Sequence, residues 1–135
     1  MTDFKTLKTL IDLLDNLQEK DISTNESKIT KQTANSIDDF LLNEYVIVRT
    51  LSAGVFAGTL RRKVGNEVEL HNTRRIWYWE GAASLSQLAE EGTSNPIKCK
   101  FPIEVSKVLL IGVIEILKVS DKAEKSIKEV PIWMN

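Results

Sequence analysis

The stretch around which the chain is organised reads Asn72-Thr73-Arg74-Arg75-Ile76-Trp77-Tyr78-Trp79-Glu80-Gly81. It places two of the chain's three tryptophans beside two adjacent arginines. In a strand, successive side chains point to opposite faces, so Arg75, Trp77 and Trp79 would share one face. Rings that stack on a base and guanidinium groups that bind phosphate are typical of a nucleotide-binding surface. Taken alone, the stretch more commonly indicates an aromatic core strand with two arginines capping it.

The residues before this stretch predict an antiparallel meander of three strands. The first strand is β-branched and aromatic, which favours burial. Gly65-Asn66 in the second turn is a two-residue hairpin signal. The predicted strands cover residues 45–50, residues 55–60 and a third segment from residue 67 through residue 71 into the stretch, with turns at 52–54 and 61–66.

The residues after the stretch predict two helices and one more strand. Small residues lead to a helix over 85–91, which Ser84 caps and Gly92 ends. Unpaired N–H groups at the start of this helix could receive a phosphate. The remaining predicted elements are a loop at 93–102, a strongly apolar and central fourth strand at 108–117, and a helix at 121–129 capped by Ser120.

The N-terminal part of the sequence differs in character. An apolar stripe predicts an amphipathic helix over residues 3–20, and the polar residues 21–35 predict a tether. The chain is therefore expected to divide into an N-terminal helix and tether, residues 1–43, and a ligand-binding domain, residues 44–135. The predicted fold class is α+β, an antiparallel β-sheet core with an N-terminal amphipathic helix and short C-terminal helices.

Composition limits the function classes. With 135 residues and a formal charge of -1, the chain has the size of one domain and lacks the positive charge of a general DNA or RNA binder. One cysteine and one histidine exclude an internal disulfide and a cysteine-rich or multi-histidine metal site. No signal peptide or membrane span is expected, which predicts a cytosolic protein. The arginines cluster in one region and leave room for a local anion site: Arg49, Arg61, Arg62, Arg74 and Arg75.

No catalytic constellation stands out in the sequence. Cys99 and His71 lie far apart along the chain, and nothing besides their presence supports a Cys-His pair. Glu67 and Glu69 on an alternating strand are typical of a solvated face. The sequence therefore predicts a binding protein that is not an enzyme and that needs no cofactor and no metal.

Two segments together resemble a known family: Arg49-Thr50-Leu51-Ser52-Ala53-Gly54-Val55-Phe56-Ala57-Gly58, and the opening stretch continued through Ala82-Ala83-Ser84-Leu85. On these motifs the chain resembles small phage and prophage proteins that counter the Thoeris bacterial immune system. The resemblance covers most of residues 44–133. Thoeris makes a cyclic ADP-ribose isomer as an alarm signal, and the phage protein is a sponge that binds this signal without cleaving it.

The resemblance implies an antiparallel sheet core with short C-terminal helices that join two protomers, and ligand pockets near that joint. It implies a homodimer or higher homo-oligomer in the host cytoplasm, holding glycocyclic ADP-ribose isomers and, in some members, cyclic oligonucleotides. Side-chain chemistry then selects the expected ligand-binding residues: Arg49, Arg74 and Arg75 for the pyrophosphate, Phe56 and Trp79 for stacking on adenine, and Asn72 and Ser84 for polar contacts.

Other interpretations stay open at the level of sequence. A phage interaction or structural module would use tryptophan and arginine at a protein interface, where both residue types are enriched. An enzyme acting on the nucleotide and a single-stranded nucleic-acid binder are weaker alternatives. The sequence also leaves open which of Arg74 and Arg75 faces the ligand, because a bulge near Thr73 would exchange the two faces of the strand.

Overall fold

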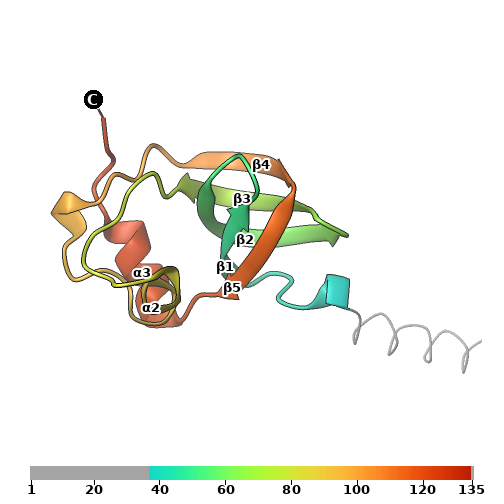
Figure 1. Ribbon diagram of the computed structural model, residues 1–135, viewed down its shortest axis with the longest axis horizontal. Coiled ribbons are helices and arrows are strands. Elements are labelled where there is room, and N and C mark those ends of the chain that lie inside the picture. The colour runs from blue at the N-terminus through green and yellow to red at the C-terminus, as the bar shows by residue number, and fades with distance from the viewer. Residues whose placement is uncertain (1–36, 135) are drawn as a thin grey trace, which may run out of the picture. The chain divides into compact units, whose positions relative to one another are not determined.

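The computed structural model describes residues 37–134 of the chain (Figure 1). The predicted helix at 3–20 and the tether at 21–35 lie outside the described residues. By its internal contacts the chain divides into two compact units, Met1–Ile37 and Asp38–Asn135. The described elements, in chain order, are η1 (Ile37–Asp39), β1 (Tyr45–Thr50), β2 (Val55–Val64), β3 (Glu67–Arg75), α2 (Leu85–Glu91), η2 (Pro96–Lys98), β4 (Val105–Ile111), β5 (Val113–Lys118) and α3 (Asp121–Glu129).

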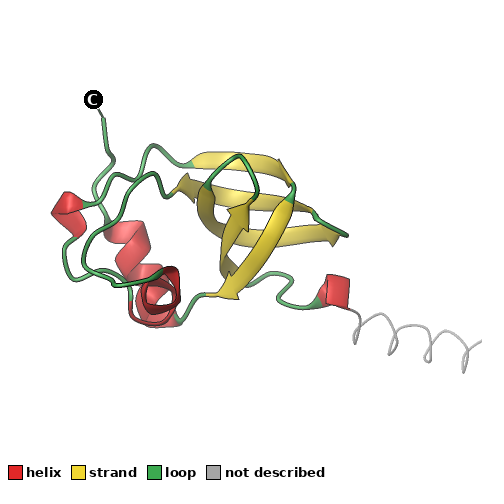
Figure 2. Ribbon diagram, in the orientation of Figure 1, coloured by secondary structure: helices red, strands yellow, loops and turns green. Residues whose placement is uncertain are grey.

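The strands form one five-stranded antiparallel sheet in the order β4-β3-β2-β1-β5. The first four strands are a meander, as the sequence predicts for the first three, and β5 returns to pair with β1. The two edge strands, β4 and β5, are separated in sequence by Gly112 alone. A single residue can join opposite edges only if the sheet curls strongly, and Figure 2 shows this curl. The described fold is thus α+β.

Two hydrophobic cores lie on opposite faces of β1. Val46 and Val48 enter an inner core within the curled sheet, while Tyr45 and Ile47 enter a helix-side core against α2 and α3. Fully burying one such side chain contributes about 1.5–3 kcal/mol. The inner core comprises Val46, Val48, Phe56, Leu60, Val68, Leu70 and Leu110, and the helix-side core comprises Tyr45, Ile47, Ala57, Ile76, Leu88, Ala89, Cys99, Phe101, Val119, Ala123, Ile127 and Val130.

Local chemistry sets the helix ends where the sequence predicts them. The Ser84 hydroxyl accepts a hydrogen bond from the Gln87 amide at 3.2 Å, and the Ser120 hydroxyl accepts one from the Ala123 amide at 3.0 Å. Gly92 ends α2 with a φ of 79°, a conformation that favours glycine. These caps satisfy amide donors that a helix start leaves unpaired.

The predicted central strand at 108–117 is wrong. Two strands occupy this run, and both are edges of the sheet, with β2 at the centre. Gly112 adopts a φ of 75° and breaks the run. Its carbonyl accepts the Leu51 amide at 2.8 Å, and the next amide, that of Val113, donates to the Asn66 carbonyl at 2.9 Å. The chain therefore leaves one edge of the sheet at this glycine and starts the other edge.

The opening stretch is a strand only in its first part. β3 ends at Arg75, and the backbone then changes partners. The Trp77 amide donates to the Lys100 carbonyl at 3.1 Å, and the Lys100 amide donates to the Tyr78 carbonyl at 2.8 Å. The Trp133 amide donates to the Phe101 carbonyl at 3.0 Å, so the C-terminal tail lies beside the same segment. The predicted shared face of Arg75, Trp77 and Trp79 therefore does not extend to Trp79, which is half-buried against the helix-side core.

Candidate functional site

A small cleft brings together two of the predicted ligand-binding residues, Phe56 and Arg75. Its volume is about 170 Å³, and its lining is apolar except for Arg75 and the Thr73 hydroxyl. One wall comes from β2 and β3, and the other comes from β4 and the segment that leads into it. The lining residues are Phe56, Thr73, Arg75, Pro102, Ile103, Val105 and Val108.

The Arg75 guanidinium is held in place at the wall of this cleft. Its Nη1 donates to the Ala53 carbonyl at 2.9 Å, and its central carbon lies 4.5 Å from the centroid of the Phe56 ring. Such a cation–π contact contributes about 0.5–2 kcal/mol, depending on desolvation. No other hydrogen bond of this guanidinium is made within residues 37–134, so the remaining N–H groups are available to an anion.

A β-bulge decides which of the two adjacent arginines reaches the cleft. Ala57 pairs with Arg74, and the next cross-strand pair is Thr59 with His71. Between these two pairs, β2 has one intervening residue and β3 has two. Asn72 takes up the difference with a φ of 51°. Beyond the bulge, Arg75 stands opposite Phe56, and Arg74 stands opposite Ala57 of the helix-side core. The face exchange that the sequence left open is therefore present.

Arg74 is buried and binds main-chain carbonyls. Its guanidinium donates to the carbonyls of Val130 at 2.6 Å, Phe101 at 2.7 Å and Ile127 at 3.0 Å, with longer contacts to those of Pro102 and Pro131. Desolvation by burial lowers the pKa of Arg74. Arg74 ties the end of α3 and the tail to the chain at Phe101, and it lies outside the cleft.

The other predicted ligand-binding residues are dispersed over the molecule. Arg49 pairs with Glu115 at 3.2 Å on the exposed surface of β1 and β5. Asn72 is exposed at the bulge, and the Trp79 indole donates to the Ala82 carbonyl at 3.2 Å. Ser84 caps α2. None of these residues lines the cleft.

Phe56 was predicted to stack on adenine, but its ring is not an open stacking surface. Its side chain is buried in the inner core, and Arg75 covers part of its ring. The residues that sequence reasoning missed come from the opposite wall, and the alternation of Ile103 and Val105 before an apolar run was the signal that could have marked them. Thr73 was also missed. Its hydroxyl oxygen is buried and has no hydrogen-bond partner within residues 37–134.

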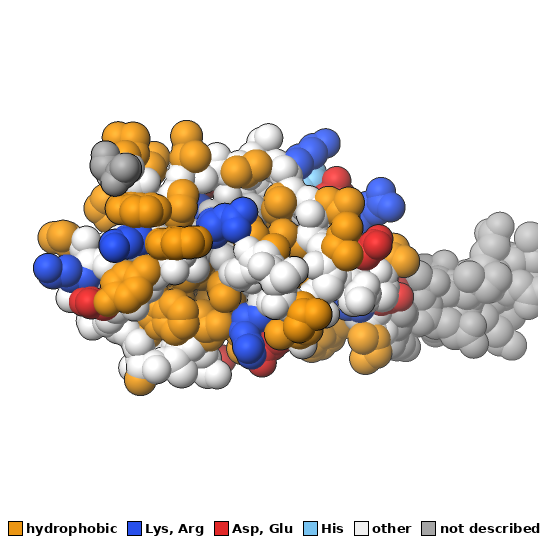
Figure 3. Space-filling model, turned by 45° about the horizontal axis from the view of Figure 1, so that its top comes forward, with side chains coloured by type: hydrophobic (Ala, Val, Ile, Leu, Met, Phe, Trp, Pro, Cys, Tyr) orange, Lys and Arg blue, Asp and Glu red, His pale blue; other side chains and the backbone are white. Residues whose placement is uncertain are grey.

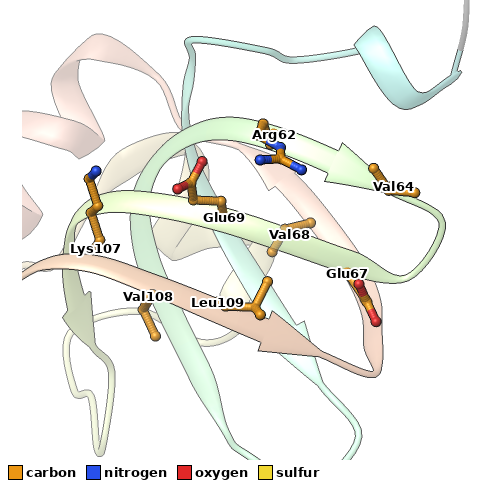
Figure 4. A pocket seen from close by; sticks show the side chains of 8 residues that line it. All are labelled: Arg62, Val64, Glu67, Val68, Glu69, Lys107, Val108 and Leu109. Carbon is orange, nitrogen blue, oxygen red and sulfur yellow. The ribbon is translucent and has the colours of Figure 1, made fainter.

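A second and larger hollow, of about 380 Å³, lies over β2, β3 and β4 (Figure 4). Figure 4 shows side chains of both charges around it, carried by these three strands. The two cations and the two carboxylates balance, so the hollow has no preference for an anion. Its lining residues are Arg62, Val64, Glu67, Val68, Glu69, Lys107, Val108 and Leu109.

An aromatic surface lies beyond the end of β3. The Lys100 ammonium lies 5.6 Å from the centroid of the Tyr78 ring and 5.7 Å from that of Trp133. Trp77 is exposed on the same segment. On the face drawn in Figure 3, hydrophobic side chains surround several lysine and arginine side chains. We call Trp77, Tyr78, Lys100 and Trp133 the aromatic surface.

These features define a small α+β protein with a curled antiparallel sheet and an apolar cleft beside one exposed arginine. Residues 43–127 match the model of a family described as "Domain of unknown function (DUF6948)", and the chain belongs to this family. Comparisons with curated proteins and with solved structures found no match. Within residues 37–134, no helix has the length and apolarity needed to cross a bilayer. The family description assigns no function, so the resemblance to Thoeris anti-defence proteins stays a proposal.

Proposed function

We propose that this protein binds a cyclic ADP-ribose-type signal and sequesters it without cleaving it. In this proposal it is a phage-encoded sponge of the host cytoplasm that prevents activation of the Thoeris effector. The observation that supports this function best is the cleft between Arg75 and Ile103, which combines an apolar space with one fixed and available guanidinium.

The size and lining of the cleft suit one ring of such a ligand. An apolar cavity of about 150 Å³ holds benzene, and the cleft measures about 170 Å³. A planar ring could therefore enter between Phe56 and Val105, while a phosphate outside it meets the N–H groups of Arg75. The lining contains no carboxylate, thiol or imidazole. The lining also offers no base to activate its one hydroxyl, that of Thr73, so it can hold a nucleotide but lacks the groups that would cleave one.

The expected affinity shows what the cleft alone would supply. An effective sponge needs nanomolar binding, about -12 kcal/mol. One enclosed base contributes about 1–3 kcal/mol, and hydrogen bonds to charged groups about 1.5–3 kcal/mol each. After the entropic cost of association, one ring and one arginine fall short of that total. Tight binding therefore requires a further wall around the ligand.

A retention experiment tests the proposal. The purified chain is incubated with cyclic ADP-ribose isomers, freed of unbound ligand, denatured by heat, and the released compounds are identified by mass spectrometry. Release of intact ligand supports sequestration. Release of an altered ligand shows an enzyme instead, and absence of retained ligand at micromolar concentrations overturns both.

The aromatic surface favours a second candidate function, an interaction module with a protein partner. Tyr78 and Trp133 are exposed beside Lys100, Trp77 is exposed on the same segment, and such residues are enriched in interface hot spots. Under this function Trp77→Ala and Trp133→Ala would abolish capture of the partner while leaving nucleotide retention unchanged. Under the first function Arg75→Ala would weaken nucleotide retention and leave partner capture unchanged.

A further inference from the structure

We propose that two copies of this chain pair through the free edges of their β4 strands, antiparallel and around a two-fold axis at Val108. β4 is the last strand on its side of the sheet, and no other strand within residues 37–134 pairs with its outer edge. An unpaired edge presents a row of N–H and C=O groups that can continue a sheet into a second molecule. The proposal rests on this strand and does not depend on the ligand.

The side chains of β4 leave this edge unprotected. Val105, Leu109 and Ile111 are 48%, 62% and 62% exposed, although each is a large apolar residue. They alternate along the strand and therefore share one face. Lys107 is the only charged residue of β4, which also contains no proline. Exposed edges usually carry several charges, proline or a bulge that discourages pairing.

The opposite edge, β5, is protected in several ways. It contains Glu115 and Lys118, and the Glu115 carboxylate is paired with Arg49 of the neighbouring strand at 3.2 Å. Its pairing with β1 contains a register shift between Arg49 and Thr50. β4 is therefore the edge that favours association.

A second copy is the occupant because β4 complements itself. Around a two-fold axis at Val108, Val105 faces Ile111 of the second copy, and Lys107 faces Leu109 of the second copy. Apolar residues then meet apolar residues, and the two lysines stay on a diagonal, roughly 7–8 Å apart between strands. No like charges stand directly opposite each other. A two-fold contact of this kind uses the same surface on both molecules and closes after two copies.

Pairing would also affect the cleft, since Val105 and Val108 belong both to β4 and to the cleft wall. Ile111 of the second copy would stand opposite Val105, beside the mouth of the cleft. The second copy would then add a wall that the single chain lacks.

The test uses charge substitutions at Leu109 in the full-length protein. Leu109→Lys puts a second ammonium opposite Lys107 and should raise the dissociation constant of the dimer at least about tenfold, because like charges directly opposite destabilise a strand pair. Leu109→Glu puts a carboxylate opposite the same lysine and should keep the dimer. Ile97→Lys is the matched control, since Ile97 is 82% exposed in η2, which lies beside α3 and outside β4.

Sedimentation equilibrium across the micromolar range, without ligand, reads out the result. A monomeric wild-type protein overturns the proposal, as does a dimer that Leu109→Lys leaves unchanged. Equal losses for Leu109→Lys and Leu109→Glu overturn the two-fold register. Thermal melting checks that each variant is folded. Because no nucleotide is present, failure here leaves the proposed ligand binding untouched, and failure of nucleotide retention leaves this result untouched.

Discussion

Arg74 and Arg75 are chemically identical neighbours with opposite tasks. The bulge at Asn72 and the alternation of the strand send Arg74 to the helix-side core and Arg75 to the cleft. The sequence predicted that a nucleotide site would use these arginines, but it could not separate them. Whether a strand contains a bulge depends on its pairing with a distant strand, which local patterns do not record.

Substituting Arg75 should affect binding and spare the fold. Arg75→Ala removes a charged donor from an exposed position, so we expect cyclic ADP-ribose binding to weaken about 10- to 100-fold. The melting temperature should change little, because one exposed hydrogen bond and one ring contact are lost. Calorimetric titration and thermal melting measure both effects. Arg61→Ala is the control, since Arg61 is exposed on β2 and outside the cleft. A large loss of stability in Arg75→Ala would show a structural role instead.

Substituting Arg74 should do the reverse. Arg74→Ala leaves the carbonyls of Phe101, Ile127 and Val130 buried without their donor. Hydrogen bonds to a charged group contribute about 1.5–3 kcal/mol each, so we expect a loss of at least about 3 kcal/mol in the free energy of unfolding. In a domain of this size that corresponds to a fall of roughly 12 °C or more in melting temperature. Chemical denaturation measures the free energy of unfolding directly. An unchanged denaturation midpoint would contradict a stabilising role for the hydrogen bonds of Arg74.

The chain's two tyrosines should both resist ionisation. Burial raises the pKa of the Tyr45 phenol above its ordinary 10.0, and the hydrogen bond from Tyr78 to the Glu80 carboxylate at 2.5 Å raises the pKa of Tyr78. A raised phenol pKa means that the folded state favours the neutral form. This stabilisation is complete below pH 10 and is lost as the pH rises through the folded pKa values. Ultraviolet titration should show phenolate only above pH 10, and Tyr78→Phe should remove one of the two titration steps.

At the scale of the element, the helices and the first strands were predictable from local chemistry, except that β2 continues to Val64, where the predicted turn covered residues 61–66. Ser84, Gly92 and Ser120 mark the helix ends by side-chain and backbone properties that act within one turn. The split of the run from Val108 to Leu117 was not predictable in this way. A single glycine inside an apolar run is compatible with a continuous strand. The break between β4 and β5 at Gly112 depends on a hydrogen bond to Asn66, which is distant in sequence.

The cost of substituting Gly112 should therefore depend on how readily the new residue adopts a positive φ. A Cβ at this position would meet only the Leu51 Cβ at 3.8 Å, an ordinary contact, so strain from the positive φ dominates. We expect Gly112→Ala to cost about 1–2 kcal/mol in the free energy of unfolding. Gly112→Asn should cost less, because asparagine adopts this conformation more readily. Urea denaturation of both variants measures the difference, and equal costs would indicate a steric cause.

At the scale of the whole molecule, the curl of the sheet creates the cleft. Ile103 and Val105 are distant in sequence from Phe56 and Arg75, and they meet only because β4 closes beside β3. The chemistry of Phe56 and Arg75 was recognisable from residue type. The opposite wall was not, since its apolar residues resemble any others until the strands are paired.

Self-association and ligand binding should be coupled if the second copy borders the cleft. A ligand that touches Ile111 of the second copy binds the dimer more tightly than the monomer, and reciprocity then requires the ligand to strengthen the dimer. We expect Leu109→Lys to weaken cyclic ADP-ribose binding at least about tenfold, although Leu109 lies outside the cleft. Saturating ligand should shift wild-type sedimentation towards the dimer, and the control Ile97→Lys should behave like wild type. A ligand affinity that is the same for monomer and dimer would mean that each cleft is complete within one chain, and the missing binding energy would then have to come from the aromatic surface.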